Sequence, residues 1–148
     1  MKTKQNDRFT IGLISGLIAA ISMTILNYIF IFATPAKFRF SDFVGIMLFG
    51  TKPDSLGEII VATGYHIALG GIFGVIFAYI ILLITNENLP LKGLTYGTGI
   101  FTILFSLGVL FDIPTLKESP LSTIISKGVC SAFYGLVLAY LLKHFSRN

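Results

Sequence analysis

Three ionisable side chains in this sequence, His66, Asp112 and Lys127, each lie within or at the edge of a long apolar run. An ionisable residue inside a membrane span is a candidate functional residue, because a charge in a hydrocarbon environment is costly to keep. An imidazole, a carboxylate and an ammonium group that met in one place would bind an ion, a proton or a polar headgroup. Whether they meet depends on the elements that hold these three residues.

Four segments are long and apolar enough to cross a bilayer as helices: Phe9–Phe32, Ile59–Ile84, Gly93–Ile113 and Leu121–Leu142. A spanning helix needs about 20 mostly apolar residues, whereas a strand of an outer-membrane barrel needs only about ten residues of alternating character. The sequence therefore predicts an all-α protein, an integral membrane four-helix bundle in which residues 1–148 form one transmembrane domain.

The composition agrees with a membrane environment. Hydrophobic residues make up 54% of the 148 residues and charged residues 12%, about half the charged share of a typical soluble domain. The first apolar run is longer than the 7–15 residues of a typical signal-peptide core, and no small-residue cleavage site follows it. We therefore expect a first helix that is retained in the mature protein.

The connection between the first two runs, Lys37–Glu58, has a mixed character. Its middle, Phe43–Phe49, is apolar but too short to span a membrane, and phenylalanines alternate with basic residues just before it. Ser41 or Asp42 is suited to cap a short helix there. We expect a helix lying in the membrane interface or a short re-entrant piece; the alternative is an ordinary loop with an apolar patch packed on the bundle.

Small residues recur at a spacing of four on the predicted helices, which places them on one helix face. Such faces let helix backbones approach closely, and in membranes dispersion and interhelical hydrogen bonds then hold the pair. The glycines predicted to carry this packing are Gly12, Gly16, Gly70, Gly74 and Gly135.

His66 continues the small face of the second helix, and Lys127 continues that of the fourth. Asp112 ends the third helix on the same side of the membrane, so the three side chains are candidates for one shallow polar pocket. A structural interpretation stays open beside the functional one: Lys127 would then extend to the interface or pair with Asp112, and His66 would bond a carbonyl group. Further neighbours expected at this pocket are Glu58, Tyr65, Ser126 and Tyr134.

Other kinds of chemistry have no support in the sequence. The two histidines do not form a metal-ligand cluster, and no phosphate-binding loop motif occurs, so we predict neither a metal nor a cofactor. The single cysteine, Cys130, cannot form an internal disulfide. The net charge of +4 comes from residues placed between apolar runs, which indicates topology signals and excludes a nucleic-acid-binding patch.

Positive residues favour an orientation with both termini in the cytoplasm, because basic residues are enriched on that side. Six of them then lie inside, close to helix ends, and five outside. The inner residues are Lys2, Lys4, Arg8, Lys92, Lys143 and Arg147, and the outer residues are Lys37, Arg39, Lys52, Lys117 and Lys127.

Several motifs resemble small four-helix bacterial membrane proteins of the YqhR type and, more widely, of the YagU type. They are GLISGLIAA, GYHIALGGIFGVIFAYIILL, KGLTYGTG, FDIP and FYGLVLAYLLKHF, between Gly12 and Phe145. The resemblance implies a four-helix membrane fold. It implies no activity and no catalytic residue, because the family has no established one.

We therefore expect a non-enzymatic multi-pass protein of the cytoplasmic membrane with a structural, partner-binding or lipid-responsive role. Its expected partners are the lipid bilayer and either a second copy of the chain or another membrane protein. The alternative is a small transporter or channel component that uses the pocket of His66, Asp112 and Lys127. A second alternative is a lipid-acting enzyme, for which His66 is the one candidate acid or base.

Overall fold

A computed structural model describes residues 7–84, 87–113, 116 and 119–146, and over these residues the chain is helical and contains no strand. The all-α prediction is thus confirmed. The helices are α1 (Arg8–Ala33), α2 (Phe40–Phe49), α3 (Leu56–Leu83), α4 (Leu89–Leu110) and α6 (Leu121–Phe145). Apart from α2, each is long and apolar enough to cross a membrane. Four residues of the orientation prediction, Lys2, Lys4, Lys117 and Arg147, lie outside the described residues.

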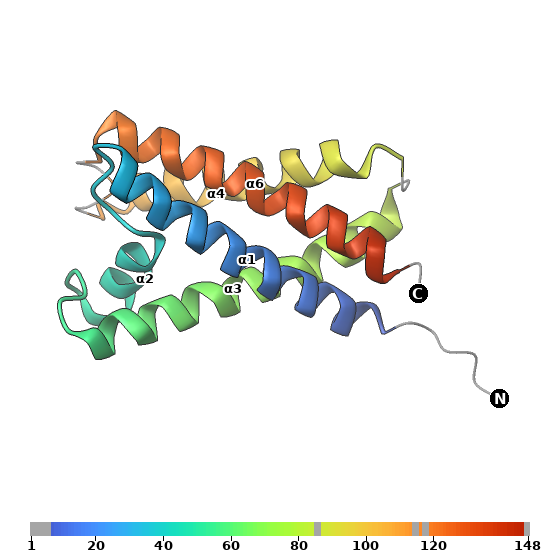
Figure 1. The fold of residues 1–148 in the computed structure, drawn as a ribbon, viewed down its shortest axis with the longest axis horizontal. Helices are drawn as coiled ribbons and strands as arrows, with labels where there is room; N and C mark the ends of the chain where they lie inside the picture. The colour runs from blue at the N-terminus through green and yellow to red at the C-terminus, as the bar shows by residue number, and fades with distance from the viewer. Residues whose placement is uncertain (1–6, 85–86, 114–115, 117–118, 147–148) are drawn as a thin grey trace.

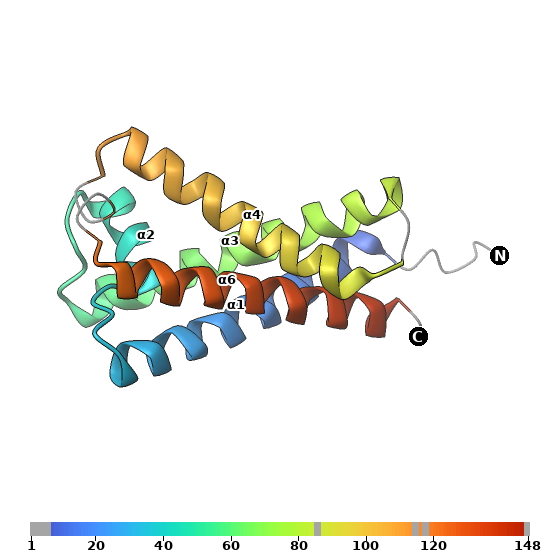
Figure 2. The same cartoon turned by 90° about the horizontal axis from the view of Figure 1, so that it is seen from above.

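The four long helices run side by side, and the described chain begins and ends at the same end of the molecule (Figures 1 and 2). α1 packs against α3 and α6, while α4 packs against α6. The short helix α2 lies at the opposite end, where it packs against α3. The molecule therefore has one end that carries the two termini and one end that is covered by α2.

Residues at the N-termini explain where two of the helices begin. α3 starts at Leu56, earlier than expected, because Ser55 accepts a hydrogen bond from the Glu58 N–H (3.2 Å) while the Glu58 carboxylate accepts one from the Ser55 N–H (3.3 Å). α4 starts at Leu89, also earlier than expected, with Pro90 in its first turn. Proline is tolerated there because the first turn has no use for its missing N–H.

The N-terminus of α1 is capped by Asp7, whose carboxylate accepts a hydrogen bond from the Phe9 N–H at 3.1 Å. The Thr10 hydroxyl also donates to this carboxylate. These hydrogen bonds, the one from Thr10 first among them, hold the pKa of Asp7 below its ordinary value. The cap thus favours a helix start at Arg8, immediately before the first apolar run.

Glycines bring α1 and α3 into backbone contact. A Cβ atom on Gly12 would lie 2.9 Å from the Gly74 carbonyl oxygen, and a Cβ atom on Gly16 would lie 2.9 Å from the Gly74 Cα. Gly70 faces the same interface, where an added Cβ would overlap the Cβ of Ala20. The small faces of the two helices are therefore in direct contact.

A second glycine contact joins α4 to α6. A Cβ atom on Gly135 would overlap the carbonyl group of Gly93 and would lie 3.1 Å from the backbone nitrogen of Gly97. In return, a Cβ atom on Gly97 would overlap the Ser131 carbonyl oxygen. These two helices approach each other backbone to backbone, which leaves no room for a side chain at Gly135.

Two tyrosines link α4 and α6 to α3 by donating hydrogen bonds to backbone carbonyl oxygens of α3. Tyr134 of α6 donates to the Gly70 carbonyl at 2.6 Å, and Tyr96 of α4 donates to the Phe73 carbonyl at 2.7 Å. Tyr134 is buried with the apolar core, which lies between α1, α3, α4 and α6. In a membrane there is no hydrophobic driving force between helices, so packing and interhelical hydrogen bonds of this kind hold them together.

We expect Tyr134→Phe to lower the free energy of unfolding by about 1 kcal/mol, within the range of interhelical hydrogen bonds in membrane proteins. The measurement is unfolding of the purified chain in mixed micelles with increasing denaturing detergent. Tyr140→Phe on the same helix is the matched control, since Tyr140 is 67% exposed. Equal stability of the two variants would show that the Tyr134 hydroxyl contributes nothing.

Candidate functional site

The candidate site lies at the end of the bundle covered by α2, and its central cation is Lys127. This residue lies in the second turn of α6, yet only 1% of its surface is exposed. Its Nζ lies 4.0 Å from the ring centroid of Phe40 and 4.4 Å from that of Phe43. Both rings belong to α2, and desolvated cation–π contacts of this kind contribute about 2 kcal/mol each.

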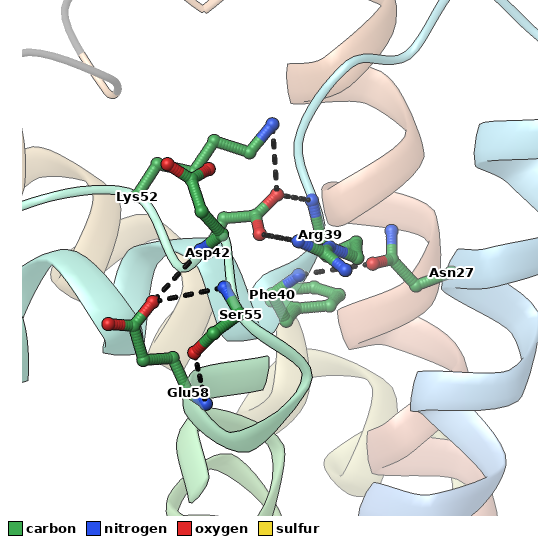
Figure 3. A network of polar contacts seen from close by, with 8 residues as sticks. Asn27, Arg39, Phe40, Asp42, Lys52, Ser55 and Glu58 are labelled. Atoms are coloured by element: carbon green, nitrogen blue, oxygen red, sulfur yellow. Dashed lines mark hydrogen bonds and ion pairs between the residues drawn. The ribbon is translucent and has the colours of Figure 1, made fainter. Parts of the chain in front are cut away.

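Phe40, the first residue of α2, contacts three of the long helices at once. Its ring stacks on the His66 imidazole of α3, with 5.1 Å between centroids and 10° between planes. Its backbone N–H donates to Asn27 Oδ1 of α1 at 3.1 Å, and its ring face meets Lys127 of α6. Figure 3 shows Asn27 pointing toward Phe40. We call these four residues the Phe40 cluster.

Three buried polar atoms of the Phe40 cluster have no hydrogen-bond partner among the described residues. They are Lys127 Nζ, His66 Nε2 and Asn27 Nδ2. The one other such atom found there, Ser15 Oγ, lies about 18 Å along α1 from Asn27 at the rise of an α-helix. A buried donor without a partner costs about 1–3 kcal/mol, and a charged one costs more. The concentration of such groups around one ring therefore needs a physical explanation.

Asp42 of α2 supplies the negative charge near this cluster, and it is fully buried. Its carboxylate accepts hydrogen bonds from Arg39 at Nε (2.9 Å) and at the backbone N–H (2.7 Å), and pairs with Arg39 Nη2 at 2.7 Å. Lys52 Nζ lies 3.9 Å away (Figure 3). The hydrogen bond to Asp42 raises the pKa of the Arg39 guanidinium.

The Asp42 carboxylate is close enough for its charge to act on Lys127, but the hydrogen bonds it accepts come from Arg39. Three cations, Arg39, Lys52 and Lys127, therefore share one buried carboxylate. Two of them pair with it directly, and Lys127 is left against aromatic rings. The cluster consequently has an excess of hydrogen-bond donors.

The structure places two of the three predicted pocket residues against one ring, and the third is exposed. His66 and Lys127 both contact the Phe40 ring. Asp112 is exposed and has a left-handed backbone (φ 53°) just after α4. Its N–H donates to the Val109 carbonyl, and the next N–H, of Ile113, donates to the Gly108 carbonyl, which is the Schellman arrangement that ends many helices.

Sequence reasoning did not identify Phe40 or Asn27 as members of the site. Asn27 carries a recognisable signal, since it continues the face of Gly16 and Ala20 along α1 at helical spacing. Phe40 carries no such signal, because its position depends on how α2 folds back onto the bundle. No group of three or more His, Cys, Asp or Glu side chains suited to a metal ion occurs in the part of the chain that the structure describes.

Comparison of the chain with known protein families, curated proteins and solved structures gives no match. The resemblance to the YqhR type therefore stays a prediction.

Proposed function

We propose that this chain is a multi-pass protein of the cytoplasmic membrane with a non-enzymatic, lipid-responsive role. In this proposal α1, α3, α4 and α6 cross the bilayer, both termini lie in the cytoplasm, and α2 lies at the outer interface. Large apolar side chains on the outer helix faces support it: Ile60 and Ile103 are 61% exposed and Leu110 is 73% exposed. Such surfaces suit lipid and would promote aggregation in water.

The observation that carries the lipid-responsive role is that α2 contacts both the surroundings and the bundle. At one end it exposes three apolar side chains, Met47, Leu48 and Phe49. At the other end, Phe40 contacts α1, α3 and α6. If the membrane interface bound the Met47–Phe49 end of α2 differently, the shift of α2 would be transmitted through Phe40 to α1, α3 and α6.

Basic residues flank α2 and suggest which lipids it responds to. Lys37 precedes the helix and is exposed, and the Lys52 side chain, which follows it, is 44% exposed. A basic side chain near anionic headgroups contributes about 1 kcal/mol of attraction. The Lys37 backbone N–H also donates to the Thr123 hydroxyl of α6 at 3.1 Å, which fixes the approach to α2. We infer that α2 responds to anionic lipid in particular.

The test is the thermal stability of the chain in vesicles of phosphatidylcholine alone and of phosphatidylcholine with phosphatidylglycerol. We expect a higher Tm with phosphatidylglycerol, and we expect Met47→Ser to reduce this increase because the apolar end of α2 no longer enters the interface. Leu91→Ser is the control, since Leu91 is 63% exposed in the first turn of α4, at the other end of the bundle. An equal Tm in vesicles with and without phosphatidylglycerol would refute the lipid-responsive role.

A small transporter component is the second candidate, and the buried cation and imidazole of the Phe40 cluster favour it. However, the core between that cluster and the other end of the bundle is mainly apolar, including Met23, Phe77 and Leu138. The buried charged residues among the described residues, Asp42 and Lys127, both lie at the end covered by α2. A charged solute would meet no buried charged partner among the described residues along that path. If His66→Ala retains normal expression but loses a transport activity, the transporter candidate would replace our proposal.

A further inference from the structure

We propose that the Phe40 cluster is a closed binding site for a phosphate group, and that α2 is its displaceable cover. This inference rests on the proposed function, because it names the chemical group through which α2 responds to lipid. The binding groups would be Lys127 Nζ, Asn27 Nδ2 and His66 Nε2, which come from α6, α1 and α3. Lys127 and Asn27 are each 1% exposed, and all three atoms have no hydrogen-bond partner among the described residues.

The chemistry of these groups selects an anion. Lysine and asparagine side-chain nitrogens are donors only, and an imidazole nitrogen donates when it carries a hydrogen. The neighbouring carboxylate of Asp42 is already engaged by Arg39 and Lys52, so it is not free to satisfy Lys127. A phosphate group offers several acceptor oxygens and a negative charge, and lysine is a common phosphate ligand.

The cover differs from the site in how it is held. The three binding groups lie on long helices joined to each other by glycine contacts and tyrosine hydrogen bonds. By contrast, the fully buried residues of α2 are small or polar: Ser41, Asp42 and Gly45. The ion pairs of α2 also stay within the helix, its cap and the loop that follows. Withdrawal of α2 would therefore leave the packing of the long helices in place.

Phe40 itself blocks the position that a ligand would take. Its ring contacts both Lys127 and His66, and its N–H donates to the Asn27 carbonyl oxygen. In the closed state, the rings of Phe40 and Phe43 contact the Lys127 side chain in place of an anion. A ligand must therefore compete with α2, and its apparent affinity is reduced by the small fraction of molecules in which the site is open.

The experiment measures binding to the full chain in a neutral sugar detergent, with the NMR signal of the labelled His66 imidazole as the readout. The probes are short-chain phosphatidic acid, inorganic phosphate and, as the neutral-headgroup reference, short-chain phosphatidylcholine. We expect phosphatidic acid to shift the His66 signal. We expect Phe40→Ala to bind it roughly tenfold more tightly, because the cover no longer competes.

Lys127→Met tests the central ligand, and we expect it to weaken binding at least tenfold, the usual scale for loss of a charged contact. Lys143→Met is the matched control, since it removes a lysine from the exposed last turn of the same helix. If Phe40→Ala does not fold, Phe40→Leu replaces it, because leucine retains bulk but removes the π faces. Binding by phosphatidic acid alone assigns the site to a lipid headgroup, and binding by inorganic phosphate as well assigns it to phosphate in general.

No shift of the His66 signal by either phosphate probe, in the wild type and in the Phe40 variants, would overturn the site. So would equal binding by the wild type and Lys127→Met. The proposed function is refuted by a separate result, an equal Tm in vesicles with and without phosphatidylglycerol. If that Tm responds while Lys127→Met binds normally, α2 responds to lipid through its exposed end and the closed site is wrong.

Discussion

Gly135→Leu is expected to prevent the folded four-helix assembly from forming, whereas Gly99→Leu on α4 is expected to leave it intact. Even a Cβ atom on Gly135 would overlap the Gly93 carbonyl, so α4 and α6 would have to separate. Nothing lies within 4 Å of a Cβ atom on Gly99. Phe105→Leu, which exchanges one half-buried apolar side chain for another, should also be tolerated.

The alanine variants give this prediction a magnitude. Overpacking of a close contact costs about 1–3 kcal/mol or more, while alanine favours a helix over glycine by about 1 kcal/mol. We therefore expect Gly135→Ala to destabilise the chain by about 2 kcal/mol and Gly99→Ala to be neutral or slightly stabilising. Size-exclusion profiles and detergent unfolding curves measure both effects. Equal stability of the Gly135 and Gly99 variants would mean that α4 and α6 do not meet at these glycines.

Asp42→Asn is expected to lower the free energy of unfolding by about 3 kcal/mol, the scale on which breaking a buried ion pair is felt. The substitution keeps the shape of the side chain but removes the one negative charge shared by Arg39, Lys52 and Lys127. Asp54→Asn removes the same charge from an exposed position before α3, and it should change stability by less than about 0.5 kcal/mol. Denaturing-detergent titrations compare the two variants directly.

A double-mutant cycle shows whether the effect of Asp42 involves the Phe40 cluster. If the carboxylate stabilises the Lys127 ammonium, Asp42→Asn should cost about 1 kcal/mol less in a Lys127→Met background, which lies within the range of coupling between neighbours. Strictly additive effects would confine the role of Asp42 to Arg39 and the start of α2. Equal effects of Asp42→Asn and Asp54→Asn would show that Asp42 is not buried in an ion pair.

The sequence was sufficient to predict the helical class, because each long helix is a continuous apolar run that has no other stable form. The first residues of α3 and α4 were harder to predict from the sequence. Ser55 and Glu58 form a reciprocal cap outside the apolar run, and Pro90 is a helix start rather than a break. Hydropathy reports which residues face apolar surroundings. It therefore misses the polar cap that begins α3, and it does not show that the first turn of α4 accommodates Pro90.

In the candidate site, helical spacing predicts some of the residues, whereas others join the site only because the chain folds back. His66 and Lys127 continue small-residue faces, so spacing along one helix was enough to place both at the bundle interior. Asp112 follows its helix closely in sequence, but the left-handed turn leaves it exposed. Phe40 and Asp42 enter the site because α2 reverses direction and packs on α3, which no periodicity in their own segment reports.

Accessibility of single cysteines in a Cys130→Ala background tests most directly whether α2 covers a buried Lys127 at one face of a membrane bundle. An impermeant thiol reagent would be added from each side of the membrane to Asp112→Cys, to Lys127→Cys, and to Lys127→Cys combined with Phe40→Ala. We predict labelling of Asp112→Cys from the outer side, no labelling of Lys127→Cys alone, and outer-side labelling of Lys127→Cys once Phe40 is removed. Labelling of Lys127→Cys with Phe40 in place, or from the side opposite to Asp112→Cys, would contradict it.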